Sequence, residues 1–291
     1  MYRSPWRPPT AIDGSDLDWP LGRLRKLAYA VGVLLKGDGS VYVTKQTRVL
    51  KHGQVTVRVP RIELKNKSKA FLDAFNDCLS QVLRRNKTRI SPPNREGHRM
   101  VRYTSKDFVS WWRGLGSAEL YRIARTFPIE YLRGRFDSDS NVGKYKICLV
   151  GVEKHRQLME FERSLCTMLG MRVGRIHSYG SIGETTFIGS KSITSKQPKI
   201  RFNVNTRDFA RNVVWLHVEW KNQVLRSPPQ RPWTPWKSDI RNRALELNSA
   251  GLSCQRVVER LWLEFNLRVP YETVYYWLQQ SERSRNLHLG E

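Results

Sequence analysis

Two stretches of this 291-residue chain decide its fold: LAYAVGVLLKGDGSV at residues 27–41 and IEYLRGRFDSDSNV at residues 129–142. Each begins as an apolar helical run, passes through glycine and an acid, and leads into an alternating strand pattern. The acids Asp38 and Asp139 are 101 residues apart. This spacing indicates an internal repeat of about one hundred residues, the kind of period that marks duplicated structural units.

A second pair of segments has the same offset. Ser105-Lys106-Asp107-Phe108 and Thr206-Arg207-Asp208-Phe209 are also 101 residues apart. Each follows a strand pattern and opens an aromatic-rich helix, so Ser105 and Thr206 are the predicted N-caps. Equal offset and equal context make chance a poor explanation.

The two copies carry the same order of predicted elements. The first has strands around 40–45 and 55–64 and a helix over 66–84; the second has a strand at 144–150, a helix over 153–169, and strands near 172–178 and 184–189. Each half therefore reads helix, strands, helix, strand, helix. Two such halves in one chain imply an α+β fold with pseudo-twofold symmetry.

The repeated acids have a specific chemistry. Each follows the carboxyl end of a buried helix, where the helix dipole already presents negative charge. Two such helices packed about a pseudo-twofold axis, with Gly32 and Gly134 allowing a close approach, would bring Asp38 and Asp139 together. Paired carboxylates favour a shared cation, and oxygen ligands suit Mg²⁺. The alternative for either acid alone is an ordinary turn residue.

These residues resemble the two signature motifs of a double-motif, single-chain LAGLIDADG homing endonuclease, over roughly residues 20–222. The second stretch fills the motif positions in order with Leu132, Gly134, Phe136, Asp137, Ser138 and Asp139. In the first stretch Asp38 takes the metal-acid position, and Lys36 replaces the earlier acid. One extra residue separates Gly32 from its acid, which a π-bulge would absorb. Ser140 replaces the usual glycine after the second acid.

The resemblance implies two αββαββα units whose saddle-shaped antiparallel sheets sit over the DNA major groove. Asp38 and Asp139 would bind Mg²⁺, or Mn²⁺ in its place, with backbone carbonyls of Gly37 and Ser138 as further metal ligands. Both DNA strands would be cut, leaving short 3′ overhangs. The resemblance also implies basic residues around the metals, and the candidates for this catalytic role are Lys45, Lys65 and Lys144. For any one lysine, a solvated phosphate contact is the alternative.

The charge of the chain supports a nucleic-acid partner. It has 51 Lys and Arg against 26 Asp and Glu, a net charge of +25, and residues 1–222 hold +22 of this. A hydrophobic content of 40% excludes a disordered basic tail. The predicted duplex-DNA contacts lie on one face of the strands or at the basic hairpin tip: Thr44, Lys45, Arg48, Lys51, Arg58, Lys144 and Lys146. A solvated surface hairpin is equally consistent with the tip.

The proline-rich composition marks a linker, the internal repeat gives the two halves, and the segment after the linker resembles a helix-turn-helix domain. We expect an N-terminal extension at 1–19, repeats at 20–125 and 126–225, a proline-rich linker at 226–237, and a helix-turn-helix domain at 238–291. In the last domain the predicted outward, DNA-binding residues are Tyr271, Thr273, Tyr275 and Tyr276. The alternative is a small three-helix interaction module.

The sequence therefore predicts a monomeric, metal-dependent endodeoxyribonuclease that makes a site-specific double-strand break and promotes mobility of its own intron or element. Two alternatives remain. Sporulation regulators also join a LAGLIDADG domain to a helix-turn-helix, although their acids are typically lost, and intron RNA maturases share the fold and bind intron RNA. The chain has no signal-peptide or membrane-helix pattern, so we expect a soluble protein in an intracellular, DNA-containing compartment without a membrane partner.

Overall fold

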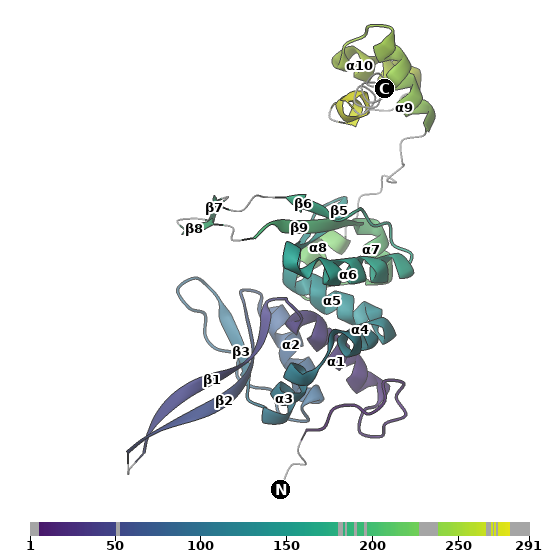
Figure 1. Ribbon diagram of the computed structural model, residues 1–291. Helices are drawn as coiled ribbons and strands as arrows, with labels where there is room; N and C mark the ends of the chain where they lie inside the picture. Colours follow the sequence, from purple (N-terminus) through teal and green to yellow (C-terminus); the bar gives the residue numbers. More distant parts are fainter. Residues whose placement is uncertain are drawn as a thin grey trace, which may run out of the picture. The chain divides into compact units, whose positions relative to one another are not determined.

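The computed structural model describes residues 6–50, 53–179, 183, 185–188, 191–194, 197–226, 238–265, 269, 271 and 273–279. The chain divides into two compact units, Met1–Pro229 and Gln230–Glu291 (Figure 1). Apart from Arg226, the predicted linker at 226–237 lies outside the described residues. Across the described part of the chain, no helix is both long and apolar enough to span a membrane.

The first half of unit 1 is built around a three-stranded antiparallel sheet of order β1-β2-β3. Its elements are α1 (Leu21–Leu34), β1 (Gly39–Leu50), β2 (Gly53–Asn66), α2 (Lys69–Val82), β3 (Arg99–Tyr103) and α3 (Lys106–Gly114). Ser105 caps α3, as predicted, by accepting a hydrogen bond from the backbone of Phe108 at 3.3 Å. The expected second pair of strands is reduced here to β3, because residues 86–98 form a loop without a strand.

The second half of unit 1 has a four-stranded antiparallel sheet of order β4-β5-β9-β6 and a separate pair, β7-β8. Its helices are α4 (Ser117–Thr126), α5 (Pro128–Asp139), the 3₁₀ turn η1 (Glu153–His155), α6 (Arg156–Met168), α7 (Thr206–Asn212) and α8 (Glu219–Arg226). Its strands are β4 (Ser140–Val142), β5 (Lys146–Val152), β6 (His177–Tyr179), β7 (Thr185–Ile188), β8 (Lys191–Thr194) and β9 (Lys199–Asn205). The α+β class and the two antiparallel sheets are therefore confirmed.

The N-cap of α7 differs from the prediction. Asn205, not Thr206, holds this position, and its side chain accepts hydrogen bonds from the backbone of Arg207 and Asp208 at 3.1 Å each. The Thr206 hydroxyl instead donates to the carbonyl of Gly143 at 2.9 Å. Asn205 and Thr206 are adjacent and both residue types are good N-caps, so the sequence did not distinguish them, and the prediction of Thr206 is wrong.

The two halves meet through α1 and α5, which pack so closely that the backbone of one helix contacts the backbone of the other. A Cβ atom placed on Gly32 would lie 2.2 Å from the carbonyl oxygen of Tyr131, and one placed on Gly134 would lie 2.3 Å from that of Tyr29. The contacts mirror each other, because each glycine meets the carbonyl three residues before the other glycine. This reciprocity is the geometric expression of the pseudo-twofold repeat.

The extra residue of the first motif is not absorbed as a π-bulge. Helix α1 ends at Leu34, and residues 35–38 form bends in which Lys36 adopts a left-handed conformation with φ of 61°. Helix α5, in contrast, continues through Asp139. A loop takes up an extra residue more cheaply than a helix, because no intrahelical hydrogen bond has to change.

We expect Gly32→Ala to lower the free energy of unfolding by about 1–3 kcal/mol, because the obstacle to the new methyl group is backbone. The matched control is Gly22→Ala in the same helix, where a Cβ atom meets nothing within 4 Å. It should be stabilising by less than about 1 kcal/mol through helix propensity. Urea unfolding followed by circular dichroism measures both, and equal stability of the two variants would contradict the close approach.

Candidate functional site

The turns that carry the two repeated acids meet at the carboxyl ends of α1 and α5. A Cβ atom on Gly37 would lie 2.9 Å from the Cβ and Oγ atoms of Ser138, so the residues before the two acids are in contact. Asp38 follows Gly37 in a bend, and Asp139 is the last residue of α5. Helix packing therefore brings together carboxylates that are 101 residues apart in the sequence.

Asp38 is an exposed carboxylate with one neutral hydrogen-bond donor. The side-chain amide of Asn66, at the end of β2, donates to Asp38 Oδ2 at 2.8 Å. Crowding by surrounding protein atoms and the nearby charge of Asp139 raise the pKa of Asp38 to about 6. Its edge nevertheless reaches solvent. A carboxylate that is both accessible and destabilised in its charged form favours a cation.

Asp139 is already paired with a cation. The guanidinium of Arg135, one helical turn earlier, donates to Asp139 Oδ2 and also to Glu162 Oε1, the latter at 2.6 Å. Glu162 lies on α6 and also accepts a hydrogen bond from the hydroxyl of Tyr131 at 2.9 Å. Burial alone would lower the pKa of Arg135, but Glu162 and Asp139 raise it above its ordinary value. The two acids therefore have different electrostatic surroundings.

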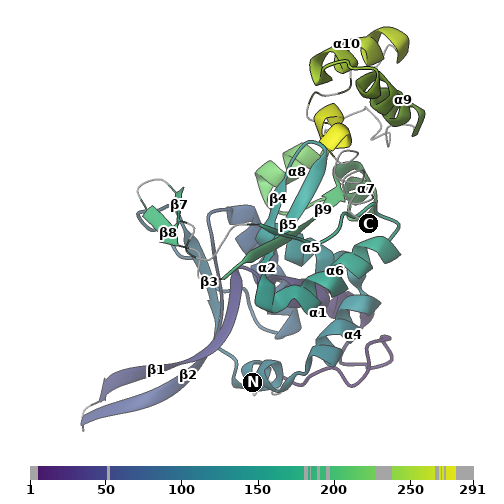
Figure 2. The ribbon, with the colours of Figure 1, turned by 45° about the horizontal axis from the view of Figure 1, so that its top comes forward.

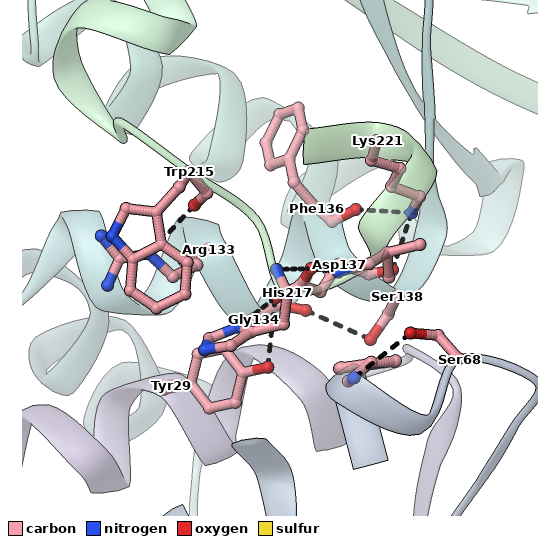
Figure 3. A network of polar contacts seen from close by, with 12 residues as sticks. Tyr29, Ser68, Arg133, Gly134, Phe136, Asp137, Ser138, Trp215, His217 and Lys221 are labelled. Carbon is pink, nitrogen blue, oxygen red and sulfur yellow. Dashed lines mark hydrogen bonds and ion pairs between the residues drawn. The ribbon is translucent and has the colours of Figure 1, made fainter. Parts of the chain in front are cut away.

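The earlier acid of the second motif, Asp137, has a structural role (Figure 3). It is 1% exposed, and its carboxylate accepts hydrogen bonds from the backbone of His217 at 2.8 Å and of Val218 at 3.1 Å. The hydroxyl of Tyr29 donates to its other oxygen at 3.1 Å, and the ring of His217 lies 2.9 Å from the same atom. Asp137 thus joins α1, α5 and the segment before α8.

Lys221 on α8 is a buried residue of the site that sequence reasoning missed. Its ammonium donates to the carbonyls of Phe136 at 2.8 Å and Asp137 at 2.7 Å, and so caps the end of α5 (Figure 3). Burial lowers the pKa of Lys221 to about 8, although Asp137, Asp38 and Asp139 act in the opposite direction. Among 51 basic residues no sequence signal singled it out.

The donor set at the two turns fits a hard divalent cation only together with further oxygen ligands. Among the described residues, no three His, Cys, Asp or Glu side chains cluster closely enough to hold a metal by themselves. Asp38 and Asp139 supply two carboxylates beside the backbone of Gly37 and Ser138. Mg²⁺ commonly binds through one or two carboxylates and completes its shell with water and substrate phosphate, so this set is compatible with it.

The three predicted catalytic lysines are exposed, and none bonds directly to either acid in the described part of the chain. Within the described part of the chain, Lys45, Lys65 and Lys144 make no hydrogen bond or ion pair with Asp38 or Asp139. Lys45 lies well along β1, Lys65 lies near the end of β2, and Lys144 lies in the turn between β4 and β5, 5.7 Å from the ring of Tyr145. Their catalytic role stays a prediction.

The predicted DNA-contact residues do not share one face of the first sheet. Lys45 pairs with Arg58, whereas Thr44 pairs with Val59. Neighbouring residues of a strand point to opposite faces of the sheet, so Thr44 and Lys45 lie on different faces. The prediction that these residues share one face is therefore wrong.

The remaining predicted contacts in this region fall in several places. Arg48 lies in β1 opposite Val55, Lys146 opens β5 opposite Asn205, and Lys51, like His52 beside it, lies outside the described residues. Figures 1 and 2 show the β1–β2 hairpin extending beyond the helices of its half.

Sequence reasoning also missed arginines that face away from the helices on both sheets. Ile62 and Leu64 are buried, so their neighbours Arg61 and Glu63 point outward. Arg102, paired with Glu63 across the sheet, donates to its carboxylate at 2.8 Å. In the second sheet Arg201 lies 4.7 Å from the ring of Tyr179. The alternation around the buried residues could have identified this face.

Unit 2 is a small helical unit whose described residues carry balanced charge. It contains α9 (Ser238–Ser249), α10 (Cys254–Phe265) and a helical segment at 273–279. The predicted contacts Tyr271, Tyr275 and Tyr276 are exposed, the rings of Tyr271 and Tyr275 stack at 6.2 Å, and Thr273 is half-buried. The described residues include four arginines and four acids. Arg243 is paired with Glu246 and Glu264.

Comparisons with known proteins give distant similarities. No family profile matches the chain. An uncharacterized protein of Methanocaldococcus jannaschii is 25% identical over 188 residues, which cover 64% of this chain and 64% of that protein. The match thus spans less than two thirds of that relative's length.

Two solved structures illustrate the structural likeness. The homing endonuclease I-DmoI in complex with DNA and Mn is 17% identical, with 66% of this chain and 97% of that chain covered and a TM-score of 0.47. A full-length DUF199/WhiA protein from Thermatoga maritima is 11% identical, with 89% and 90% covered and a TM-score of 0.43. Likenesses this weak assign no activity to this chain.

We expect Asp137→Asn to lower the free energy of unfolding by about 1–3 kcal/mol, because an amide nitrogen in place of one oxygen leaves buried donors unpaired. The control is Asp73→Asn, an exposed acid of α2 that pairs with Lys69 at the surface. Its loss should stay below about 0.5 kcal/mol. Urea unfolding of the two variants checks the difference, and similar losses would mean that Asp137 is not the joint between the helices.

Proposed function

We propose that this chain binds duplex DNA and cuts both strands in a reaction that depends on a divalent cation, as a site-specific homing endonuclease would. The observation that carries the proposal is the meeting of Asp38 and Asp139 at the ends of two helices in backbone contact. Neighbouring carboxylates repel each other, and Asp139 also lies at the negative end of α5. This arrangement supports a bound cation as part of the proposed reaction.

The residues of the chain have separable tasks in this reaction. A bound Mg²⁺ would lower the pKa of a water molecule and stabilise charge on a phosphodiester. Asp38 and Asp139 would hold the ion, and the carbonyls of Gly37 and Ser138 would be further oxygen ligands. Lys221 would hold the last turn of α5, which carries Asp139, by donating to two of its carbonyls. The outer face of each sheet would position the duplex.

The charge distribution supports DNA as the partner. Residues 1–222 carry a net charge of +22, and phosphate neutralisation by Lys and Arg is the main source of DNA affinity. Both sheets present arginines away from the helices, among them Arg61, Arg102 and Arg201. Arg102 is partly neutralised by Glu63, so it would contribute less to phosphate neutralisation than an arginine without an acidic partner.

A second candidate is a DNA-binding regulator that does not cut. The observation that favours it is the Arg135–Asp139 ion pair, which already neutralises one of the two acids. The test of both functions is a duplex made by joining the sequences that flank the element encoding this chain. Cleavage with Mg²⁺ that stops with EDTA supports the nuclease, whereas tight binding without cleavage supports the regulator. Binding of the element's transcript in place of the duplex would contradict both and favour a maturase.

We expect Asp38→Asn and Asp139→Asn each to lower the cleavage rate at least about a hundredfold while changing DNA affinity less than about threefold, because each amide removes a negative charge beside the reacting phosphate and its cation but no DNA contact. Gel assays with strand-specific labels and a filter-binding titration measure the two quantities. The control is Asp107→Asn, an acid in the first turn of α3. Full cleavage by both site variants would show that these acids are not the metal ligands.

The raised pKa of Asp38 predicts the pH dependence of cleavage. Below about pH 6 this carboxyl is protonated and cannot hold a cation, so the rate at limiting Mg²⁺ should rise as the pH increases through this value. Because Mg²⁺ competes with the proton, more Mg²⁺ should move the midpoint to lower pH. Initial rates at two Mg²⁺ concentrations test this, with DNA binding in EDTA as the control. A midpoint independent of Mg²⁺ would exclude Asp38 as its origin.

A further inference from the structure

The two motif helices are equivalent in backbone position but not in charge. A Cβ atom on Gly32 would lie 3.0 Å from the backbone nitrogen of Arg135, and one on Gly134 would lie 3.1 Å from that of Val33. Val33 and Arg135 thus occupy corresponding positions, each directly after its glycine. One half has a buried apolar side chain where the other has a guanidinium.

Arg135 is fixed by a second acidic partner besides Asp139. It is 2% exposed, and its second partner, Glu162 on α6, is fully buried. Glu162 Oε1 accepts from both Arg135 and Tyr131, whereas Glu162 Oε2 has no hydrogen-bond partner among the described residues. Arginine stays charged at any physiological pH, and a buried ion pair is costly to break from one side. The positive charge beside Asp139 is therefore permanent.

Within the described residues Asp38 makes no ion pair with a basic side chain, although the charges of Lys221 and Arg135 both act on it. The neutral amide of Asn66 donates a hydrogen bond to Asp38, and the helix position that corresponds to Arg135 holds Val33. Lys221 acts on both acids through its charge, but its ammonium is committed to two carbonyls of α5. The cation that a pair of carboxylates requires is thus supplied by the protein at Asp139 and has to come from solution at Asp38.

We propose that Arg135 is a positioning residue and built-in counter-ion for Asp139, so that a divalent cation bound to the protein depends on Asp38 more than on Asp139. This inference rests on the proposed function, since it assigns unequal roles to the two acids of that site. It also explains why an arginine follows Gly134, the residue at which α5 contacts the backbone of α1. The side chain of Arg135 reaches past this interface to Glu162 on α6.

The test is a titration of the whole chain with Mn²⁺, in which electron paramagnetic resonance measures free Mn²⁺ and hence the number bound. We expect one tightly bound Mn²⁺ per chain, displaced by Mg²⁺. Asp38→Asn should lower its affinity at least about tenfold, and Asp139→Asn should lower it less than about threefold. A comparable loss in both variants would overturn the inference.

A double variant tests the role of Arg135 directly. Arg135→Leu with Glu162→Gln removes the guanidinium without leaving a buried charge, and the glutamine can still accept from Tyr131. We expect Mn²⁺ binding in this background to depend on Asp139 as strongly as on Asp38, because the competing positive charge is gone. Glu162→Gln alone, which keeps Arg135, is the matched control: it should lose stability, because one side of the buried pair is removed, but Mn²⁺ binding should still depend on Asp38 more than on Asp139.

The outcomes separate the inference from the function on which it rests. Equal dependence on Asp38 and Asp139 in the wild type, with Mg²⁺-dependent cleavage retained, overturns the role of Arg135 and leaves the nuclease standing. Absence of any bound Mn²⁺ together with absence of cleavage overturns both. If the double variant does not fold, as its thermal melt would show, the comparison of the two single acid variants still decides.

Discussion

Backbone contact between α1 and α5 is the constraint on which the rest of unit 1 depends. Two glycines remove the side chains that would hold the helices apart, and each admits the carbonyl oxygen of the opposite helix. The halves are thereby locked in one relative position, which places the turns after the helices against each other. Without this contact Asp38 and Asp139, which belong to different halves, would lie apart, and the charge of Asp139 would not raise the pKa of Asp38.

Buried charge then distinguishes the two halves. The last turns of α5 hold Asp137, which joins the helices, and Arg135, which links Asp139 to Glu162. Lys221 closes the end of the same helix. The corresponding end of α1 is apolar up to Leu34 and then bends. Duplicated units commonly diverge in this way, because one half can take on a supporting task once the symmetric contact itself is secure.

The repeat, the fold class and the meeting of Asp38 with Asp139 could be predicted, because each depends on local patterns that occur twice at one spacing. The supporting network could not. Glu162 and Lys221 reach the site from α6 and α8, and no local pattern connects them to α5. Arg135 could have been noticed, since it lies four residues before Asp139 and so on the same helix face. Thr44 was misplaced because adjacent strand residues cannot share a face.

Charge is also divided between the two units, and this limits what unit 2 can contribute. Its described arginines and acids are equal in number, and Arg243 is neutralised within the unit. In the proposed complex with DNA, counterion release and the salt dependence of binding would therefore come almost entirely from unit 1. Unit 2 instead exposes aromatic side chains, among them Trp262 and Tyr276. Any affinity it adds would come from contacts of shape and apolar area, which salt weakens little.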